Sequence, residues 1–154
     1  MSDPTITFCH AQRQDVPVIL SFIKELAAHE GIPEAVHATE AELENHLFDK
    51  SSAQVLFICE NGKKIGFALY FYGFSSYPCK PYLFINDLFV SKEHRGKGYG
   101  KLLMNKLIQI AEEKGCCRLE WLCFEGNSSG IRFYETMDAE LKNELLIYRK
   151  TILK

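Results

Sequence analysis

Apolar and polar positions along the chain follow two periods, which predict an ordered series of strands and helices. Alternating or continuous apolar runs predict strands over residues 5–9, 53–60, 64–74, 82–90, 118–124 and 145–152. Helical spacing predicts helices between Asp15 and Gly31, over 41–48, from a glycine-rich loop to about Lys114, and over 128–137. With no internal repeat or linker, the series predicts one mixed α/β domain over residues 1–154.

Local signals sharpen several of these boundaries. Asp15 and Pro17 are typical of a helix start, and Thr39 with Glu42 three residues later forms a capping-box pattern. Asn61-Gly62, between two apolar runs, is typical of a tight hairpin turn.

The junction between the strand at 82–90 and the next helix is rich in glycine and positive charge. Residues 95–100 read Arg-Gly-Lys-Gly-Tyr-Gly, and the stretch 92–106 carries five Lys or Arg against one acid, Glu93. A glycine turn entering a helix directs backbone N–H groups and the positive end of the helix dipole towards one point, which favours phosphate oxygens. The spacing fits neither the dinucleotide-binding fingerprint nor the P-loop. A diphosphate ligand is the favoured interpretation, and a turn selected only for tight packing is the alternative.

Composition narrows the possible partners. The chain has 154 residues, 47% apolar content and a net charge of −2, so no nucleic acid or anionic membrane is expected as a partner. No apolar run approaches the roughly 20 residues that span a membrane, and residues 1–4 lack the pattern of a signal peptide. The six cysteines have no metal-type spacing, so we expect reduced thiols, a cytoplasmic location and no metal. Cys59 and Cys123 are interpreted as small core residues, with a catalytic role for Cys123 as the alternative.

The charge is unevenly distributed along the chain. Residues 25–49 contain seven acids, three histidines and no Lys or Arg, in contrast to the basic glycine-rich segment. One region therefore suits phosphate and the other could suit a cationic substrate. The alternative is that these acids form solvated helix faces.

Three segments carry a resemblance to a known family. They are Ile85-Asn-Asp-Leu-Phe-Val90, then Arg95-x-x-Gly98-x-Gly100, then Asn127 followed seven residues later by Tyr134. Together they resemble the GNAT superfamily of acyl-CoA-dependent N-acetyltransferases. Residues 22–30, with His29-Glu30 at their end, are similar to the spermidine/spermine (diamine) N-acetyltransferase branch.

The resemblance implies a fold and a cosubstrate. It implies a single GNAT-like α/β domain with a mostly antiparallel sheet, flanked by helices, that splays between the strands at 83–90 and 118–124. It implies acetyl-CoA as cosubstrate, with Asn127 and Tyr134 beside the pantetheine arm. The other expected cofactor contacts are Leu88, Phe89, Val90, Arg95, Gly96, Lys97, Gly98, Tyr99, Gly100 and Lys101.

Acetyl transfer to an amine needs a neutral amine, a stabilised oxyanion and a proton for the leaving thiolate. Tyr134 occupies the family's position for that acid, and a packing tyrosine is the alternative. The polyamine branch carries a Glu-Asp pair where this chain has Asn86-Asp87, and Asn86 cannot accept a proton. The candidates for the base are Asp87, then Glu30, Glu34 or a histidine of the acidic segment, and finally bulk water. Strand alternation predicts that Asn86 and Asp87 face opposite sides.

We therefore expect an acetyl-CoA-dependent N-acetyltransferase that acts by direct attack on a small primary amine such as a polyamine, diamine or lysine-like amino acid. Glu30, Asn86 and Asp87 are the expected substrate contacts. The alternatives are a protein or peptide N-acetyltransferase and a non-catalytic acyl-CoA-binding module. A homodimer is expected, and Tyr72, Phe74, Tyr77 and Tyr82 are either an acceptor-pocket cluster or simple packing.

Overall fold

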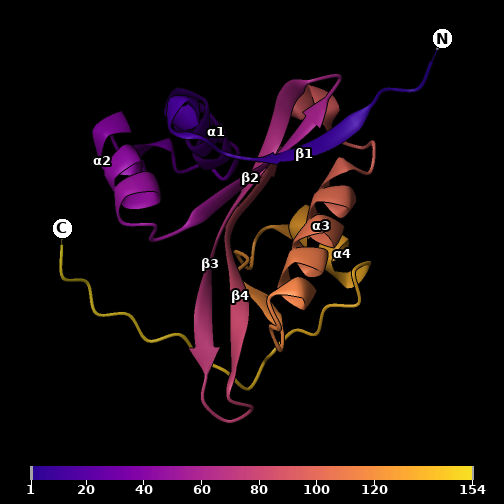
Figure 1. Cartoon of the computed structure of the whole chain (residues 1–154). Coiled ribbons are helices and arrows are strands. Elements are labelled where there is room, and N and C mark those ends of the chain that lie inside the picture. Colours follow the sequence, from indigo (N-terminus) through magenta and orange to yellow (C-terminus); the bar gives the residue numbers. More distant parts are fainter. Residues whose placement is uncertain (1, 154) are drawn as a thin grey trace. The chain divides into compact units, whose positions relative to one another are not determined.

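The computed structural model describes residues 2–153 and contains a five-stranded sheet, in which β1 to β4 can be followed in Figure 1. The strand order is β1-β2-β3-β4-β5, and every neighbouring pair is antiparallel except β4 and β5, which are parallel. The strands are β1 (Ile6–His10), β2 (Gln54–Glu60), β3 (Lys63–Ser75), β4 (Lys80–Val90) and β5 (Leu119–Trp121). The longer helices are α1 (Val16–His29), α3 (Tyr99–Glu113) and α4 (Ser128–Glu135). The short ones are α2 (Glu40–Glu44), the π turn η3 (Asn45–Asp49), and the 3-10 turns η1 (Arg13–Asp15), η2 (Pro33–Ala35) and η4 (Lys92–His94).

Two of the local signals, the capping box and the hairpin turn, have the geometry that their chemistry predicts. Thr39 N donates to Glu42 Oε2 at 3.0 Å, and Glu42 N donates to Thr39 Oγ1 at 3.2 Å, so the capping box at α2 is confirmed. Asn61 and Gly62 have φ of +49° and +82°, the left-handed pair that a two-residue hairpin turn requires.

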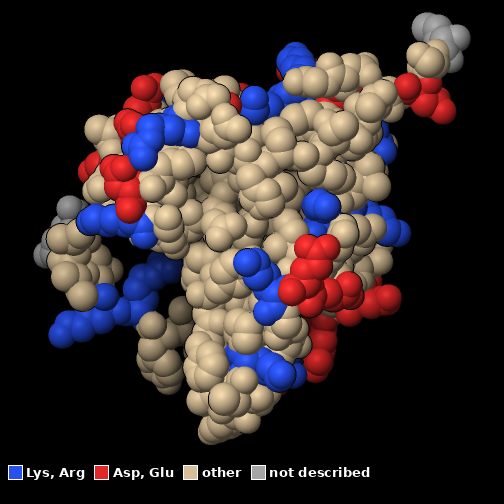
Figure 2. Space-filling view, in the orientation of Figure 1, with Lys and Arg blue, Asp and Glu red and all other residues tan. Residues whose placement is uncertain are grey.

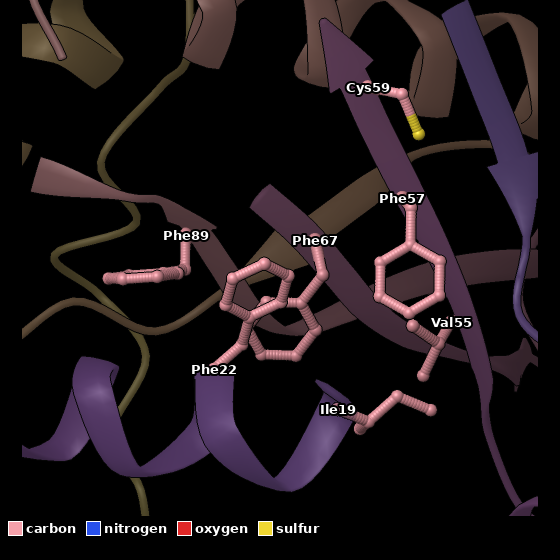
Figure 3. Packing of buried hydrophobic residues seen from close by; sticks show 7 residues of the cluster. All are labelled: Ile19, Phe22, Val55, Phe57, Cys59, Phe67 and Phe89. Carbon is pink, nitrogen blue, oxygen red and sulfur yellow. The ribbon is translucent and has the colours of Figure 1, made fainter. Parts of the chain in front are cut away.

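Aromatic packing holds α1 against one face of the sheet (Figure 3). Phe22 of α1 lies 6.3 Å from Phe57, 5.6 Å from Phe67 and 5.7 Å from Phe89, measured between ring centroids. Truncating such a buried ring to Ala costs about 3–5 kcal/mol. We call this side the α1 face. The inner side of α3 is also buried, including Leu103, Met104 and Leu107, and α3 packs against β4.

A β-bulge interrupts the pairing of β3 with β4. Leu69 pairs with Asp87 but the next residue, Tyr70, pairs with Ile85, so Asn86 is an extra residue in β4. Directly opposed residues share a face, which places Asp87 with Leu69, on the same side as Phe67 and Phe89. The bulge therefore determines which β4 side chains reach the α1 face.

The sheet opens beside the second half of β4. Pairing with β5 covers only Leu83, Ile85 and the residue between them, while β4 continues to Val90. This agrees with the predicted splay, and the predicted α/β class with a mostly antiparallel sheet flanked by helices is confirmed. The strand predicted over 118–124 is too long, because only Leu119–Trp121 has a neighbour to pair with.

The described chain divides between Leu122 and Cys123 into two compact units, so the prediction of one domain over residues 1–154 stays a prediction. In the second unit the strand predicted over 145–152 is absent, and Leu145, Leu146 and Ile147 are exposed. A strand needs a neighbour for its N–H and C=O groups, and none pairs with this segment within residues 2–153. Cys123 is exposed, so its interpretation as a core residue is wrong, whereas Cys59 is buried as predicted.

Within the described residues, no helix combines the length and apolar character that crossing a bilayer would require.

Candidate active site

The glycine-rich loop requires glycine at two positions because their backbone is in the left-handed region. Gly96 and Gly98 have φ of +76° and +82°, and a Cβ at either position would meet no atom within 4 Å. Open space around both residues contradicts the alternative that they were selected only for tight packing. A non-glycine residue in this conformation costs about 1–2 kcal/mol.

Helix α3 begins directly after Gly98. By helix geometry, the N–H groups of its first turn have no acceptor within the helix, and they carry the positive end of the dipole. Lys97 and Lys101 are exposed beside this helix start. The loop and the first turn therefore offer backbone donors and positive charge to an anion such as a diphosphate.

Arg95 at the start of the loop holds neighbouring elements together. Its Nε donates to Val90 O at 2.9 Å, its guanidinium lies 5.4 Å from the Phe89 ring centroid, and Nη1 lies 3.2 Å from His29 Nδ1. Burial and the Arg95 charge lower the pKa of His29, which favours a neutral ring that accepts this hydrogen bond. Arg95 thereby ties the end of β4 to the end of α1.

Two carboxyl groups approach each other on the α1 face, close to the contacts of Arg95 with Val90 and His29. Glu30 immediately follows α1, and Asp87 follows the bulge in β4. Burial raises the pKa of Asp87, partly offset by the Asn86 side chain, whose Nδ2 donates to Asp87 Oδ2 at 3.2 Å. Burial, and then the charge of Asp87, raise the pKa of Glu30. Two carboxyl groups with raised pKa values, one of them opposed by the charge of the other, favour a cation beside them.

The prediction that Asn86 and Asp87 face opposite sides is wrong. Strict alternation fails at the bulge, and the two side chains lie within hydrogen-bond distance instead. The bulge also brings Phe84 to the same face as Asp87, because Phe84 pairs with Phe71 across the sheet. The rings of Phe71 and Phe84 stack with their centroids 5.1 Å apart.

This aromatic pair takes the place of the cluster predicted around residues 75–81. The segment there is a short hairpin turn in which Phe74 and Tyr77 are exposed by 66% and 100%. Tyr82 pairs with Gly73, whereas Tyr72 pairs with Leu83, so Tyr72 and Tyr82 occupy opposite faces. Strict alternation across Asn86 would have placed Phe84 away from Asp87, which is why the sequence did not reveal the Phe71–Phe84 pair.

Three of the seven acids of the segment 25–49 are engaged in local structure. Glu44 and Asp49 each lie 2.9 Å from the Arg13 guanidinium, and Glu42 belongs to the capping box. Figure 2 shows acidic side chains gathered over α2 with basic ones beside them. Glu30 differs from these acids because its carboxyl lies near a second carboxyl.

In the second unit, Asn127 and Tyr134 lie on helix α4. Asn127 caps the helix, because its Oδ1 accepts from Gly130 N at 3.0 Å and from Ser129 Oγ at 3.3 Å. Tyr134 follows seven residues later, about two turns along the same side of α4. The half-buried Tyr134 ring lies 5.4 Å from that of Phe133. Their predicted roles beside the pantetheine arm remain predictions.

Comparison with known proteins assigns the fold and the glycine loop to one family. The family model described as the Acetyltransferase (GNAT) family matches residues 20–138. This chain belongs to the GNAT family. The match includes β4 and the glycine loop and extends to Tyr134, so the predicted family and the prediction of an acyltransferase enzyme are confirmed.

Two relatives match most of this GNAT chain. A human protein named spermidine/spermine N(1)-acetyltransferase-like protein 1 is 33% identical over 141 residues, covering 84% of this chain but only 20% of the human protein. A thialysine N-epsilon-acetyltransferase of Caenorhabditis elegans is 31% identical over 135 residues, covering 87% of this chain and 79% of that protein.

Solved structures show the same architecture. An integron cassette protein from the mobile metagenome of V. cholerae superposes with a TM-score of 0.78 and 29% identity, over 95% of this chain and 92% of that one. A soil-metagenome aminoglycoside acetyltransferase solved with sisomicin reaches a TM-score of 0.80 over 96% of this chain. At 18% identity, the second structure supports the fold alone.

The loop of this chain fits the acetyl-CoA that GNAT acetyltransferases use as cosubstrate. Gly96 and Gly98 leave their backbone open to an approaching diphosphate, and α3 begins where such an anion would need donors. Within residues 2–153, no group of three or more His, Cys, Asp or Glu side chains is arranged to hold a metal ion.

Proposed function

We propose that this GNAT enzyme transfers the acetyl group of acetyl-CoA to the primary amine of a small cationic molecule, such as a polyamine, a diamine or a lysine-like amino acid. The observation that carries the proposal is the Glu30–Asp87 carboxyl pair, in which Glu30 follows α1 and Asp87 lies on the strand that leads to the glycine loop. Asp87 and Val90 are three residues apart, roughly 10 Å of extended strand. A cation at the carboxyl pair would lie within the reach of a donor anchored at the loop.

The loop and the end of β4 hold the donor in this proposal. The backbone of Gly96 to Lys101 and the side chains of Lys97 and Lys101 bind the diphosphate. The unpaired second half of β4, from Leu88 to Val90, offers backbone groups to the pantetheine arm. Bound there, acetyl-CoA supplies a thioester-activated acetyl group for direct attack by the amine in a ternary complex.

The carboxyl pair binds and prepares the acceptor. Glu30 holds a substrate ammonium, and the stacked Phe71 and Phe84 rings offer a further surface to a cation. Asp87 takes a proton from the attacking amine, a role helped by burial, which raises its pKa. Asn86 orients the Asp87 carboxyl through its hydrogen bond and does not itself accept the proton.

Tyr134 is the proposed acid that protonates the departing thiolate. A phenol with a pKa of about 10 retains its proton at pH 7 and can donate it to a thiolate whose thiol has a pKa of about 8.5. The register of Asn127 and Tyr134 on α4 supports this assignment, as does the extension of the family match beyond Tyr134. Asn127 is proposed to hold the pantetheine arm.

The names of the relatives favour a small amine over a protein acceptor. They include the spermidine/spermine and thialysine enzymes, and an L-ornithine N5-acetyltransferase of Arabidopsis thaliana that is 36% identical over 86 residues. That alignment covers 56% of this chain and 38% of the plant protein. The acceptor, the cytoplasmic location and the whole-protein activity are therefore proposals for this chain.

The deciding experiment measures thiol release from acetyl-CoA with spermidine, putrescine, ornithine, lysine, thialysine and a short peptide. We expect turnover with at least one small diamine and little with the peptide. Tyr134→Phe is expected to reduce kcat on the best amine by 100-fold or more, with nearly unchanged CoA binding. CoA binding without turnover on any amine would support the non-catalytic module, and preference for the peptide would support the protein acetyltransferase.

A homodimer is part of the proposal because the second unit exposes a long apolar segment. Leu145, Leu146, Ile147 and Tyr148 are exposed by 63%, 76%, 67% and 91%. A run of apolar side chains of this size is a common sign of a protein–protein contact. Sedimentation of the wild type against a variant truncated after Asn143 is expected to show a dimer that the truncation converts to a monomer.

A further inference from the structure

One carboxylate at the end of β2 is hydrogen-bonded to both ends of the glycine loop. Glu60 Oε1 accepts from Tyr99 OH at 2.5 Å, and Tyr99 is the first residue of α3, directly after the loop. Glu60 Oε2 lies 3.2 Å from His94 Nε2, and His94 ends the 3-10 turn directly before the loop. The four loop residues between His94 and Tyr99 are thus closed at both ends through a single side chain.

The contacts continue from His94 into the sheet. His94 Nδ1 lies 2.7 Å from Ser91 Oγ, and Ser91 N donates to Ile65 O at 2.8 Å. If the ring is neutral and Nε2 donates to Glu60, Nδ1 accepts from the Ser91 hydroxyl, so each polar atom has a matching partner. The group is largely shielded from water, with side-chain exposures of 19% for Glu60 and 15% for His94, and with Tyr99 buried.

The arrangement compensates for the flexibility of the glycines. Gly96 and Gly98 adopt left-handed conformations that few other residues tolerate, but glycine also has many alternative conformations in a free loop. Fixing the two ends of the loop before a ligand arrives removes much of the ordering that binding would otherwise require. Glu60 itself points to Tyr99 and His94, and an anionic side chain is a poor direct ligand for phosphate.

We infer that Glu60 is a positioning residue for the diphosphate loop, acting through Tyr99 and His94 to set the affinity for the CoA moiety without contacting it. This inference rests on the proposed use of acetyl-CoA, and it adds a residue outside every motif through which the chain resembles its family. The binding energy lost without Glu60 should therefore be confined to ligands that carry the diphosphate.

The experiment compares two donors that differ in the diphosphate. Acetyl-CoA carries it, whereas S-acetylpantetheine has the same thioester and arm without it. Glu60→Ala is expected to raise the KM for acetyl-CoA and the Kd for CoA about 10-fold, to change kcat less than twofold, and to leave kcat/KM for S-acetylpantetheine unchanged. Glu60→Gln keeps one acceptor oxygen and is expected to be intermediate.

Two tyrosine variants separate positioning from general damage. Tyr99→Phe removes one bond to Glu60 and is expected to weaken CoA binding by a factor of about 3 to 5. Tyr70→Phe is the matched control, because Tyr70 is fully buried and its hydroxyl bonds His10 and Gln54, away from the loop. We expect it to lower the melting temperature at least as much as Tyr99→Phe while leaving the Kd for CoA unchanged.

The outcomes test the role of Glu60 separately from the proposed function on which it rests. A wild type that does not bind CoA overturns the proposed function and the inference with it. A wild type that binds CoA, with Glu60→Ala binding equally well, overturns the inference alone. An equal loss with S-acetylpantetheine, or a parallel loss in Tyr70→Phe, also overturns it, because either result indicates structural damage unrelated to the loop.

Discussion

The glycine loop and the carboxyl pair lie near the same strand, β4, but offer a ligand opposite kinds of groups. At the loop, Tyr99, His94 and Arg95 all have hydrogen-bond partners, and the features offered to a ligand are backbone N–H groups. At the carboxyl pair, Glu30 and Asp87 have raised pKa values, and the feature offered is the negative charge of two side chains. The donor site is thus held in place by its contacts with the protein, whereas the acceptor site presents carboxyl groups whose ionised forms their surroundings disfavour. Substitutions on the two sides should therefore act differently on stability and on turnover.

The largest effect is expected from Asp87→Asn. If Asp87 takes the proton from the amine, kcat/KM should fall 100-fold or more, whereas the Kd for CoA should stay within twofold. Asn86→Ala is the matched control, because it removes the orienting bond and leaves the base, so its effect should be far smaller. Equal losses in the two variants would contradict the assignment of the proton to Asp87.

The same variant should be more stable than the wild type. The folded-state pKa of Asp87 lies above its unfolded value, so its contribution to stability is complete below the unfolded pKa and is lost as pH rises through the folded pKa. At pH 7 the wild type loses stability by keeping an ionised carboxyl group buried, and Asp87→Asn does not. Thermal melts should show that the melting temperature of the variant exceeds that of the wild type by more at pH 7 than at pH 4. Such an opposition between activity and stability is common at active sites.

On the donor side, Gly98→Ala should raise the Kd for CoA about 10-fold, because a Cβ disfavours φ of +82°. The matched control is Gly62→Ala in the β2–β3 turn, which has the same φ and equally open surroundings. Both variants should lose about 1–2 kcal/mol of stability, but only Gly98→Ala should weaken CoA binding. A similar Kd change in the two variants would mean that loop geometry does not control donor affinity.

A smaller effect is expected from Glu30→Gln, which should raise the KM for a diamine about fivefold. In the wild type, activity should fall on acidification at a pH above that of an ordinary carboxyl group, because protonation of the pair removes its attraction for an ammonium. Burial raises the pKa of Asp87 and Glu30 does not contribute to that shift, so the acidic side of the profile should keep its position in Glu30→Gln. A profile that moves to lower pH would place the titrating group at Glu30.

The smallest effect is expected from Phe84→Leu, which keeps the apolar surface but removes the ring face. The KM for the amine should rise about two- to fivefold, the range for a single cation–π contact. Phe74→Leu serves as control because Phe74 lies exposed at the end of the β3–β4 hairpin. Equal KM values for the two variants would show that the aromatic pair does not contribute to acceptor binding.

The parts of the fold predicted correctly depend on short-range chemistry. The Thr39–Glu42 box, the Asn61-Gly62 turn and the glycine loop each depend on residues within a few positions of one another. The strand predicted over 145–152 was wrong because β propensity does not supply a neighbouring strand. The apolar pattern over 145–152 could therefore not decide by itself whether a strand forms there.

The site was only partly predictable for a related reason. Arg95, Gly98, Glu30 and Asp87 were identified from charge and motif, but Glu60 was not, because an acid at the end of a strand is unremarkable until Tyr99 and His94 approach it. The bulge at Asn86 was missed because it depends on the count of residues in β3 as well as in β4. Its consequence, the shared face of Asp87 and Phe84, could not be derived from alternation alone.

The bulge at Asn86 also creates a position in β4 that can be substituted without changing the pairing of the strand. Leu69 and Tyr70 are consecutive on β3 and pair with Asp87 and Ile85, so the ladder on either side is complete without counting Asn86. Substitution at this position can therefore change the chemistry beside Asp87 without shifting the register of β4. Asn86, beside the proposed base, is therefore a position where acceptor preference can diverge between related enzymes while the architecture stays the same.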